Sequence, residues 1–191
     1  LKTVLMKPNL AEREELERQA AAVGAAFRHD AAIFPCLDGA RAPLALRVAP
    51  EEAVRADLAT AERRATWREK IEKTAAQPAG DRLYACAAGR SAFHADPFGG
   101  LSPCLLAGHA RCEAAGRAFR DVWNGEIGAI QDRKRARTDT SFAGDLRGAC
   151  AHCPAFNRLE TGDDELESDY MKRTTALRFG AAMEMDHESD R

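Results

Sequence analysis

The first third of the chain has the hydrophobic pattern of an α/β unit. Residues 1–6 (LKTVLM) form a short apolar run that predicts a buried strand. Residues 10–23 are strong helix formers whose apolar positions share one face. Short strands are predicted at residues 25–28 and 33–34. This strand–helix–strand order is typical of a parallel α/β sheet, but one such unit cannot close a barrel, so it indicates a remnant of a larger fold.

The pattern that follows predicts a further strand and then a long helical stretch. Residues 44–48 are apolar enough for a strand. Pro50, followed by two acidic residues, is a favourable helix start. Helical character continues to about residue 76 with a break. We therefore expect helices to dominate this part of the chain.

A domain boundary is predicted at residues 77–80 (QPAG), which have the composition of a linker. It divides the chain into predicted domains at residues 1–78 and 79–191. In the second domain, alternation around a proline–glycine turn at residues 93–101 predicts a β-hairpin. Helices are predicted at residues 117–124, 126–137 and 164–183, a loop at 139–148, and a fraying acidic tail at 184–191.

Composition narrows the classes of protein to consider. The chain has 191 residues, 45% hydrophobic and 30% charged, with a net charge of −2. We therefore expect a packed core and no nucleic-acid partner, and we interpret the one basic run, residues 133–137 (RKRAR), as a solvated helix end. No apolar stretch approaches the ~18 residues that span a membrane, and no signal peptide is visible. A cytoplasmic location follows as the prediction, and there the six cysteines indicate metal or redox chemistry before disulfides.

Four cysteines have a spacing that suits a metal site. Cys86 and Cys104 flank the predicted hairpin, and Cys150 and Cys153 form a CxxC. A hairpin and a CxxC turn together supply four converging thiolates, the soft ligands that an iron–sulfur cluster or zinc prefers. The spacing alone leaves these two metals equally open. A thioredoxin-like dithiol is disfavoured, because the CxxC does not follow a strand of a βαβ unit.

Three further residues are weaker candidates for metal ligands. Cys36 is predicted to be a small buried hydrophobic residue. Cys112 is more often a bystander than a ligand at this position, but it is the possible substitute for one of the four. His152, inside the CxxC, is predicted to be exposed and to set the local polarity.

Three segments resemble one known family. Residues 86–104 (CAAGRSAFHADPFGGLSPC) resemble the opening of a SPASM or twitch domain, a C-terminal extension of radical SAM enzymes. Residues 119–124 (FRDVWN) resemble the tryptophan-containing helix that follows there, and residues 150–162 (CAHCPAFNRLETG) resemble a later segment with a CxxCP and a Leu-Glu-Thr-Gly. The resemblance covers about residues 81–180. Residues 1–75 resemble, more loosely, the end of the partial barrel of these enzymes.

The resemblance implies a fold and a cofactor. The expected fold is an α/β remnant of a partial (β/α) barrel, followed by a small α+β SPASM/twitch domain of a β-hairpin and helices. The implied cofactor is one auxiliary 4Fe-4S cluster on Cys86, Cys104, Cys150 and Cys153, with Cys112 as the possible substitute. The implied function belongs to a peptide- or protein-modifying maturase, with a peptide or protein as substrate.

The departures from the family limit this prediction. Full SPASM domains have about seven cysteines and two clusters, whereas Ser141 and Gly144 stand where a further CxxC normally lies, and Lys172 or a neighbour stands in place of a later cysteine. One cluster is therefore expected.

The CxxxCxxC motif that holds the catalytic cluster is absent, as is the glycine-rich SAM contact. This chain alone is therefore not expected to cleave SAM, and no catalytic residue is assigned. SAM would bind only to a complete protein, and the strand-like start at Leu1 indicates a missing N-terminal radical SAM half. Whether the chain is an enzyme stays open. The alternatives are a non-enzymatic structural zinc-binding or interaction module on the same cysteines, or a disabled fragment without metal.

Overall fold

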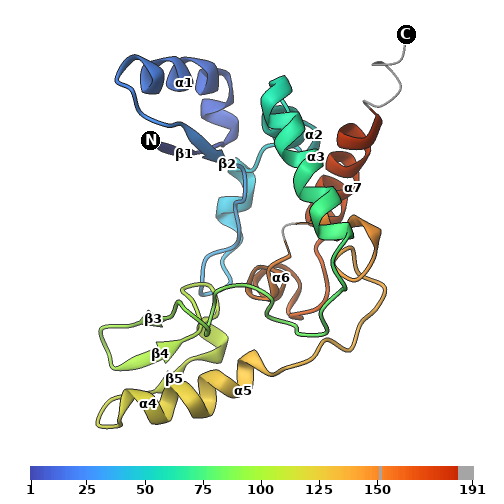
Figure 1. The fold of residues 1–191 in the computed structure, drawn as a ribbon. Coiled ribbons are helices and arrows are strands. Elements are labelled where there is room, and N and C mark those ends of the chain that lie inside the picture. Colours follow the sequence, from blue (N-terminus) through green and yellow to red (C-terminus); the bar gives the residue numbers. More distant parts are fainter. Residues whose placement is uncertain (151, 185–191) are drawn as a thin grey trace.

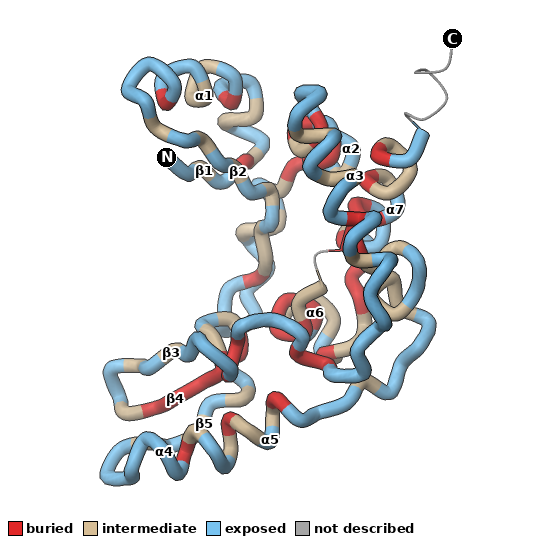
Figure 2. Tube along the Cα trace, in the orientation of Figure 1, coloured by how far each residue is buried: buried red, intermediate tan, exposed pale blue. Residues whose placement is uncertain are grey.

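The computed structural model describes residues 1–150 and 152–184 (Figure 1). Residue 151 and residues 185–191, which include most of the tail that we expected to fray, lie outside the described residues. Helices predominate, and the strands are short. Buried residues gather where α2 (Pro50–Asp57), α3 (Ala61–Ala75) and α7 (Asp169–Met183) meet, around α6 (Pro154–Thr161), and along β4 (Gly100–Ser102) (Figure 2). The molecule thus has several small cores in place of one.

The N-terminal unit has the predicted strand–helix–strand order. Strands β1 (Lys2–Val4) and β2 (Arg28–Asp30) pair in parallel. The connection between them contains the 3₁₀ helix η1 (Lys7–Glu12) and helix α1 (Arg13–Ala22). Gly24, with φ of +67°, follows α1 in the left-handed conformation that only glycine adopts readily. The predicted parallel pairing of the first strand is therefore present.

Two other predicted strands are wrong. Residues 33–34 are irregular, and residues 44–48 overlap the 3₁₀ helix η2 (Ala42–Leu46). Within the described residues the N-terminal sheet consists of β1 and β2 alone, so neither segment has a neighbouring strand to pair with.

The predicted helical stretch and its break are confirmed. Helix α2 (Pro50–Asp57) has proline at its start, and helix α3 (Ala61–Ala75) begins after Thr60, whose hydroxyl accepts a hydrogen bond from the Arg63 N–H at 3.2 Å. Helix α7 (Asp169–Met183) packs against both helices. The predicted domain boundary at residues 77–80 separates α2 and α3 from α7 in the sequence. These helices nevertheless pack together across that boundary.

The predicted hairpin is confirmed and has a third strand. Strands β3 (His94–Ala95), β4 (Gly100–Ser102) and β5 (Cys112–Glu113) form an antiparallel sheet in that order. Gly99 makes the turn with φ of +83°, and a Cβ there would lie 2.7 Å from the Ala115 Cβ. A short 3₁₀ helix, η3 (Gly108–Ala110), connects β4 to β5.

The two helices predicted at residues 117–124 and 126–137 form one continuous helical segment, which ends earlier than predicted. It comprises α4 (Phe119–Val122), the π-helical turn η4 (Trp123–Ile127) and α5 (Gly128–Gln131). The basic run at 133–137 is therefore not a helix end, and that interpretation is wrong. The run is extended because it pairs with residues 81–83, with Leu83 N–H donating to the Arg133 carbonyl at 2.8 Å.

The C-terminal part contains two elements that the sequence pattern did not indicate. They are the 3₁₀ helix η5 (Asp145–Gly148), which lies on α3, and helix α6 (Pro154–Thr161). Helix α6 has proline at its first position and Gly162, with φ of +82°, just after its end. Within the described part of the chain, no helix is long and apolar enough to cross a membrane.

Candidate metal centre

Two of the predicted cysteine ligands, Cys86 and Cys104, lie in the neighbourhood of a third, Cys153, which comes from a distant segment. Cys86 precedes the hairpin, Cys104 follows β4, and Cys153 precedes α6. The pKa of Cys153 is raised first by burial and also by the nearby thiols of Cys104 and Cys86. Cys104 packs on the buried pair Leu83 and Tyr84, whereas Cys86 is exposed. We call these three cysteines the cysteine site.

The N-terminus of α6 positions one sulfur of this site. The Sγ of Cys153 accepts a hydrogen bond from the backbone N–H of Phe156 at 3.4 Å. The N–H groups of Phe156 and Ala155 act to lower the pKa of Cys153 and partly oppose its burial. The positive end of a helix favours a thiolate, which is the form that binds metal.

The fourth predicted ligand, Cys150, has different partners. It is 8% exposed, and its thiol donates a hydrogen bond to Oε1 of Glu167 at 3.3 Å. Burial is the main cause that raises the pKa of Cys150 to about 12, and Glu167 adds to it. The other oxygen of Glu167 accepts the Ser141 N–H at 2.9 Å. Cys150 is thus held as a protonated thiol on the α7 side of the chain.

The two remaining cysteines lie in other surroundings. Cys112 donates to the Leu101 carbonyl across β4 and β5 at 3.2 Å. Burial and then Glu126 raise the pKa of Cys112. Cys36 is exposed, so the prediction that it is buried is wrong. Its backbone is part of a tight turn, in which the Gly39 N–H donates to the Cys36 carbonyl at 2.9 Å, and Pro35 takes the buried position.

His152 is not the exposed residue that the sequence predicted. Its ring stacks on Phe142, with centroids 4.0 Å apart and planes 14° apart. Nε2 lies 3.2 Å from the Leu83 carbonyl and must be the donor, since a carbonyl only accepts. Nδ1 then carries a lone pair, and it is buried without a hydrogen-bond partner among the described residues. Burial lowers the pKa of His152, so the ring is neutral near pH 7.

A buried polar network borders the cysteine site. The side chain of Asp164 is 2% exposed and lies 2.6 Å from Arg133, 3.3 Å from Arg158 and 3.5 Å from His109. Nε2 of His109 is 3.4 Å from the Tyr84 hydroxyl. Burial, then Asp164 and two cysteine thiols, raise the pKa of Tyr84. The network joins α5, α6 and the hairpin region, and the cluster of acids at 163–165 was its only signal in the sequence.

The side-chain types at the cysteine site suit a metal ion, but the side chains lie too far apart to bind one together. Three thiols and a neutral imidazole with a free lone pair are the soft and intermediate donors that zinc and iron–sulfur clusters take. Among residues 1–150 and 152–184, however, no group of three or more His, Cys, Asp or Glu side chains is close enough to hold an ion. Metal binding therefore requires these side chains to close in.

Comparisons with known proteins return no relative. The chain matches no family model, no curated protein and no solved structure. Any function must therefore be argued from the residues and their geometry.

Proposed function

We propose that this chain is an auxiliary cluster-binding region of a radical SAM protein of the SPASM or twitch type, and that it holds one 4Fe-4S cluster. The supporting observation is that Cys86 and Cys104 lie near enough to Cys153, at the N-terminus of α6, for their thiols to raise its pKa. These residues come from segments far apart in the sequence. Converging thiolates on a rigid backbone are what such a cluster requires.

Cys150 is the proposed fourth ligand, because it is the partner of Cys153 in the CxxC. To bind iron, it must lose its proton and its hydrogen bond to Glu167. Cluster binding therefore costs the free energy of this deprotonation and of the lost hydrogen bond, and we expect Cys150 to leave Glu167 on binding. Cys112 is the substitute ligand, less favoured because its thiol is engaged with Leu101.

When bound, the cluster would supply a one-electron redox centre. The chain's own contributions are to hold the ligands, to donate the Phe156 N–H to a ligand sulfur, and to exclude water with the buried Tyr84. Because the sequence has no CxxxCxxC motif, SAM cleavage is assigned to a separate N-terminal radical SAM half. The proposed role is to bind a peptide or protein substrate, or to pass electrons, in the cytoplasm, which suits six free thiols.

Anaerobic reconstitution with iron and sulfide tests this proposal. We expect about four iron and four sulfide per chain. Cys86→Ala, Cys104→Ala and Cys153→Ala should each lose most of the iron. Cys36→Ala is the matched control, because Cys36 is an exposed thiol outside the site. Failure to bind iron, or full iron content in Cys86→Ala, would contradict the proposal.

A structural zinc site is the second candidate, and His152 favours it. Its buried Nδ1 lacks a partner among the described residues, while Nε2–H donates to a backbone carbonyl. Histidines that bind metal commonly donate their other ring N–H in this way. With Cys86, Cys104 and Cys153 it would complete a Cys₃His set. Metal analysis of protein purified without oxygen tests this alternative. About one zinc and no iron per chain, together with loss of the zinc in His152→Ala, would establish it.

A further inference from the structure

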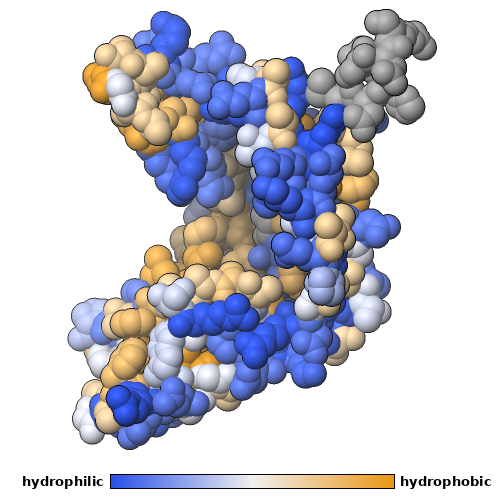
Figure 3. All heavy atoms as spheres, in the orientation of Figure 1, coloured by the Kyte–Doolittle hydropathy of each residue, from blue (hydrophilic) through white to orange (hydrophobic). Residues whose placement is uncertain are grey.

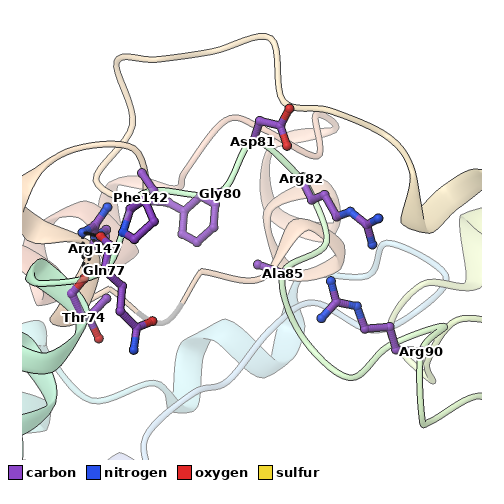
Figure 4. A pocket seen from close by; sticks show the side chains of 11 residues that line it. Thr74, Gln77, Gly80, Asp81, Arg82, Ala85, Arg90, Phe142 and Arg147 are labelled. Carbon is purple, nitrogen blue, oxygen red and sulfur yellow. Dashed lines mark hydrogen bonds between the residues drawn. The ribbon is translucent and has the colours of Figure 1, made fainter.

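A pocket of about 350 Å³ lies next to the cysteine site (Figure 4). It is formed by the end of α3, the segment that follows it, and the loop that carries Phe142. Ala85 lines the pocket, and Cys86 is the next residue in the chain. We call this hollow the arginine pocket, because Arg82, Arg90 and Arg147 all line it.

The lining carries an excess of positive charge. The three arginines are accompanied by one carboxylate, Asp81. That carboxylate is neutralised from outside by Lys134, whose Nζ lies 2.6 Å from Oδ2. An anion entering the pocket is therefore attracted by the lining.

One arginine is fixed as part of the wall. The guanidinium of Arg147 donates to backbone carbonyls at the end of α3, among them those of Thr74 at 2.7 Å and Ala75 at 2.9 Å. These bonds satisfy carbonyls that have no partner within the helix. Arg147 thus contributes charge and rigidity, and its N–H groups are already in use.

The other two arginines have capacity for a ligand. Figure 4 shows the guanidinium groups of Arg82 and Arg90 directed toward each other at one side of the pocket. The guanidinium of Arg90 makes no hydrogen bond or ion pair within the described part of the chain, and Arg82 has an exposed pair with Asp132 at 3.4 Å. Two facing guanidinium groups repel each other, and an oxyanion between them replaces that repulsion with charge-assisted hydrogen bonds.

The opposite side of the pocket is apolar. Figure 4 shows Phe142 across the pocket from Arg82 and Arg90. Pro78, Ala79 and Ala85 add further apolar surface. A hollow of this volume is too large for a bare phosphate or acetate, and an apolar wall with a few polar groups is typical of small-molecule sites.

We infer that the arginine pocket binds a small organic anion. Its carboxylate or phosphate lies between Arg82 and Arg90, and its apolar part fills the space toward Phe142. The pocket requires no metal, so anion binding can be tested whether or not the proposed cluster is present. The pocket wall includes Ala85, which directly precedes Cys86 in the chain.

Ligand-detected NMR titrations with matched probes test this inference on metal-free and on reconstituted protein. Benzoate and phenyl phosphate should bind about tenfold more tightly than acetate and inorganic phosphate, which lack the apolar part. The tighter of the two aromatic probes identifies the preferred anion. Benzyl alcohol, which lacks the charge, should not bind. Equal binding of benzyl alcohol and benzoate, or of benzoate and acetate, would overturn the inference.

Three variants locate the binding. Arg82→Ala combined with Arg90→Ala should weaken benzoate binding about tenfold. Asp132→Asn removes a competitor for Arg82 and should strengthen it, a gain that a merely structural role would not give. Arg120→Ala, at an exposed arginine on α4, is the control and should change nothing. Unchanged affinity in the double variant would overturn the assignment, whatever the iron content.

Discussion

Asp57 on α2 and Arg178 on α7 form an ion pair that is largely shielded from solvent. Nη2 of Arg178 lies 2.6 Å from Oδ2 of Asp57, and Nε lies 3.2 Å from the same oxygen. The other Asp57 oxygen is 3.3 Å from Nε2 of His29, and Arg178 also donates to the Ala149 carbonyl at 2.9 Å. The Asp57 carboxylate therefore connects α2 to strand β2 through His29 and to α7 through Arg178. Arg178 extends this network to Ala149, in the segment that leads to the CxxC.

Asp57→Asn should destabilise the fold by about 3 kcal/mol, because it leaves a buried guanidinium without its counter-charge. The side chains of Arg178 and Asp57 are only 9% and 18% exposed, so solvent cannot replace the lost partner. Urea unfolding followed by circular dichroism measures the loss. A change close to zero would show that α7 does not depend on this pair.

Glu51→Gln is the matched control for this experiment. Glu51 pairs with Arg173 at 3.0 Å and joins the same two helices, but both side chains are largely exposed. Exposed pairs contribute little because water and salt screen them. The unfolding midpoint of Glu51→Gln should therefore stay close to that of the wild type.

The stability that Asp57 provides should disappear in acid. Burial alone would raise the pKa of Asp57, but the partners His29 and Arg178 outweigh it and hold the pKa below its ordinary value of 3.8. A lowered folded-state pKa contributes stability that is complete above the unfolded value and is lost as the pH falls through the folded value. The stability difference between wild type and Asp57→Asn should thus be constant above about pH 4 and shrink below it. A difference that persists undiminished in strong acid would contradict this explanation.

Local signals predicted much of the secondary structure, whereas tertiary contacts decided the rest. Gly99 and Pro50 mark the hairpin turn and a helix start because their backbone preferences act within a few residues. Helix α6 also has proline at its start and glycine after its end, Pro154 and Gly162, but it spans only eight residues, so no extended apolar periodicity predicted it. A strand at 44–48 would have needed a neighbouring strand, and no local pattern reports whether one exists.

The candidate site was predictable in its residue types and only partly in its geometry. The turn between Cys86 and Cys104 follows from the hairpin. Their joining with Cys153 in one metal site stays a prediction, because no group of three or more ligands among the described residues is close enough to hold an ion. The hydrogen bond from Cys150 to Glu167 joins positions in different elements, so spacing within the CxxC gave no sign of it. The burial of His152 likewise depends on a distant partner, the ring of Phe142.

Thiol labelling of the metal-free protein should separate Cys150 from the cysteine site. Burial and Glu167 raise the pKa of Cys150 to about 12, so Cys150 is almost entirely the protonated thiol at pH 8, and only the thiolate reacts with iodoacetamide. Cys86 is exposed and should label early, together with Cys36 as the internal control. Mass spectrometry of a time course should find Cys150 last, with all sites equal in urea. Equal rates for Cys150 and Cys86 in folded protein would show that Glu167 does not hold this thiol.

A pair of glycine substitutions should measure how tightly η5 lies on α3. A Cβ at Gly148 would lie 2.5 Å from the Cα of Ile71 and 2.9 Å from its carbonyl oxygen, and neither backbone atom can move aside cheaply. Gly148→Ala should therefore cost about 2 kcal/mol or more through overpacking. Gly180, in α7, has no atom within 4 Å of the added methyl group, so Gly180→Ala should stabilise the helix by up to about 1 kcal/mol.

Because Gly148 lies two residues before Cys150, Gly148→Ala should also displace Cys150 and reduce iron uptake. Gly180→Ala should bind iron as the wild type does. Equal stability of the two variants would mean that η5 does not contact α3 in solution.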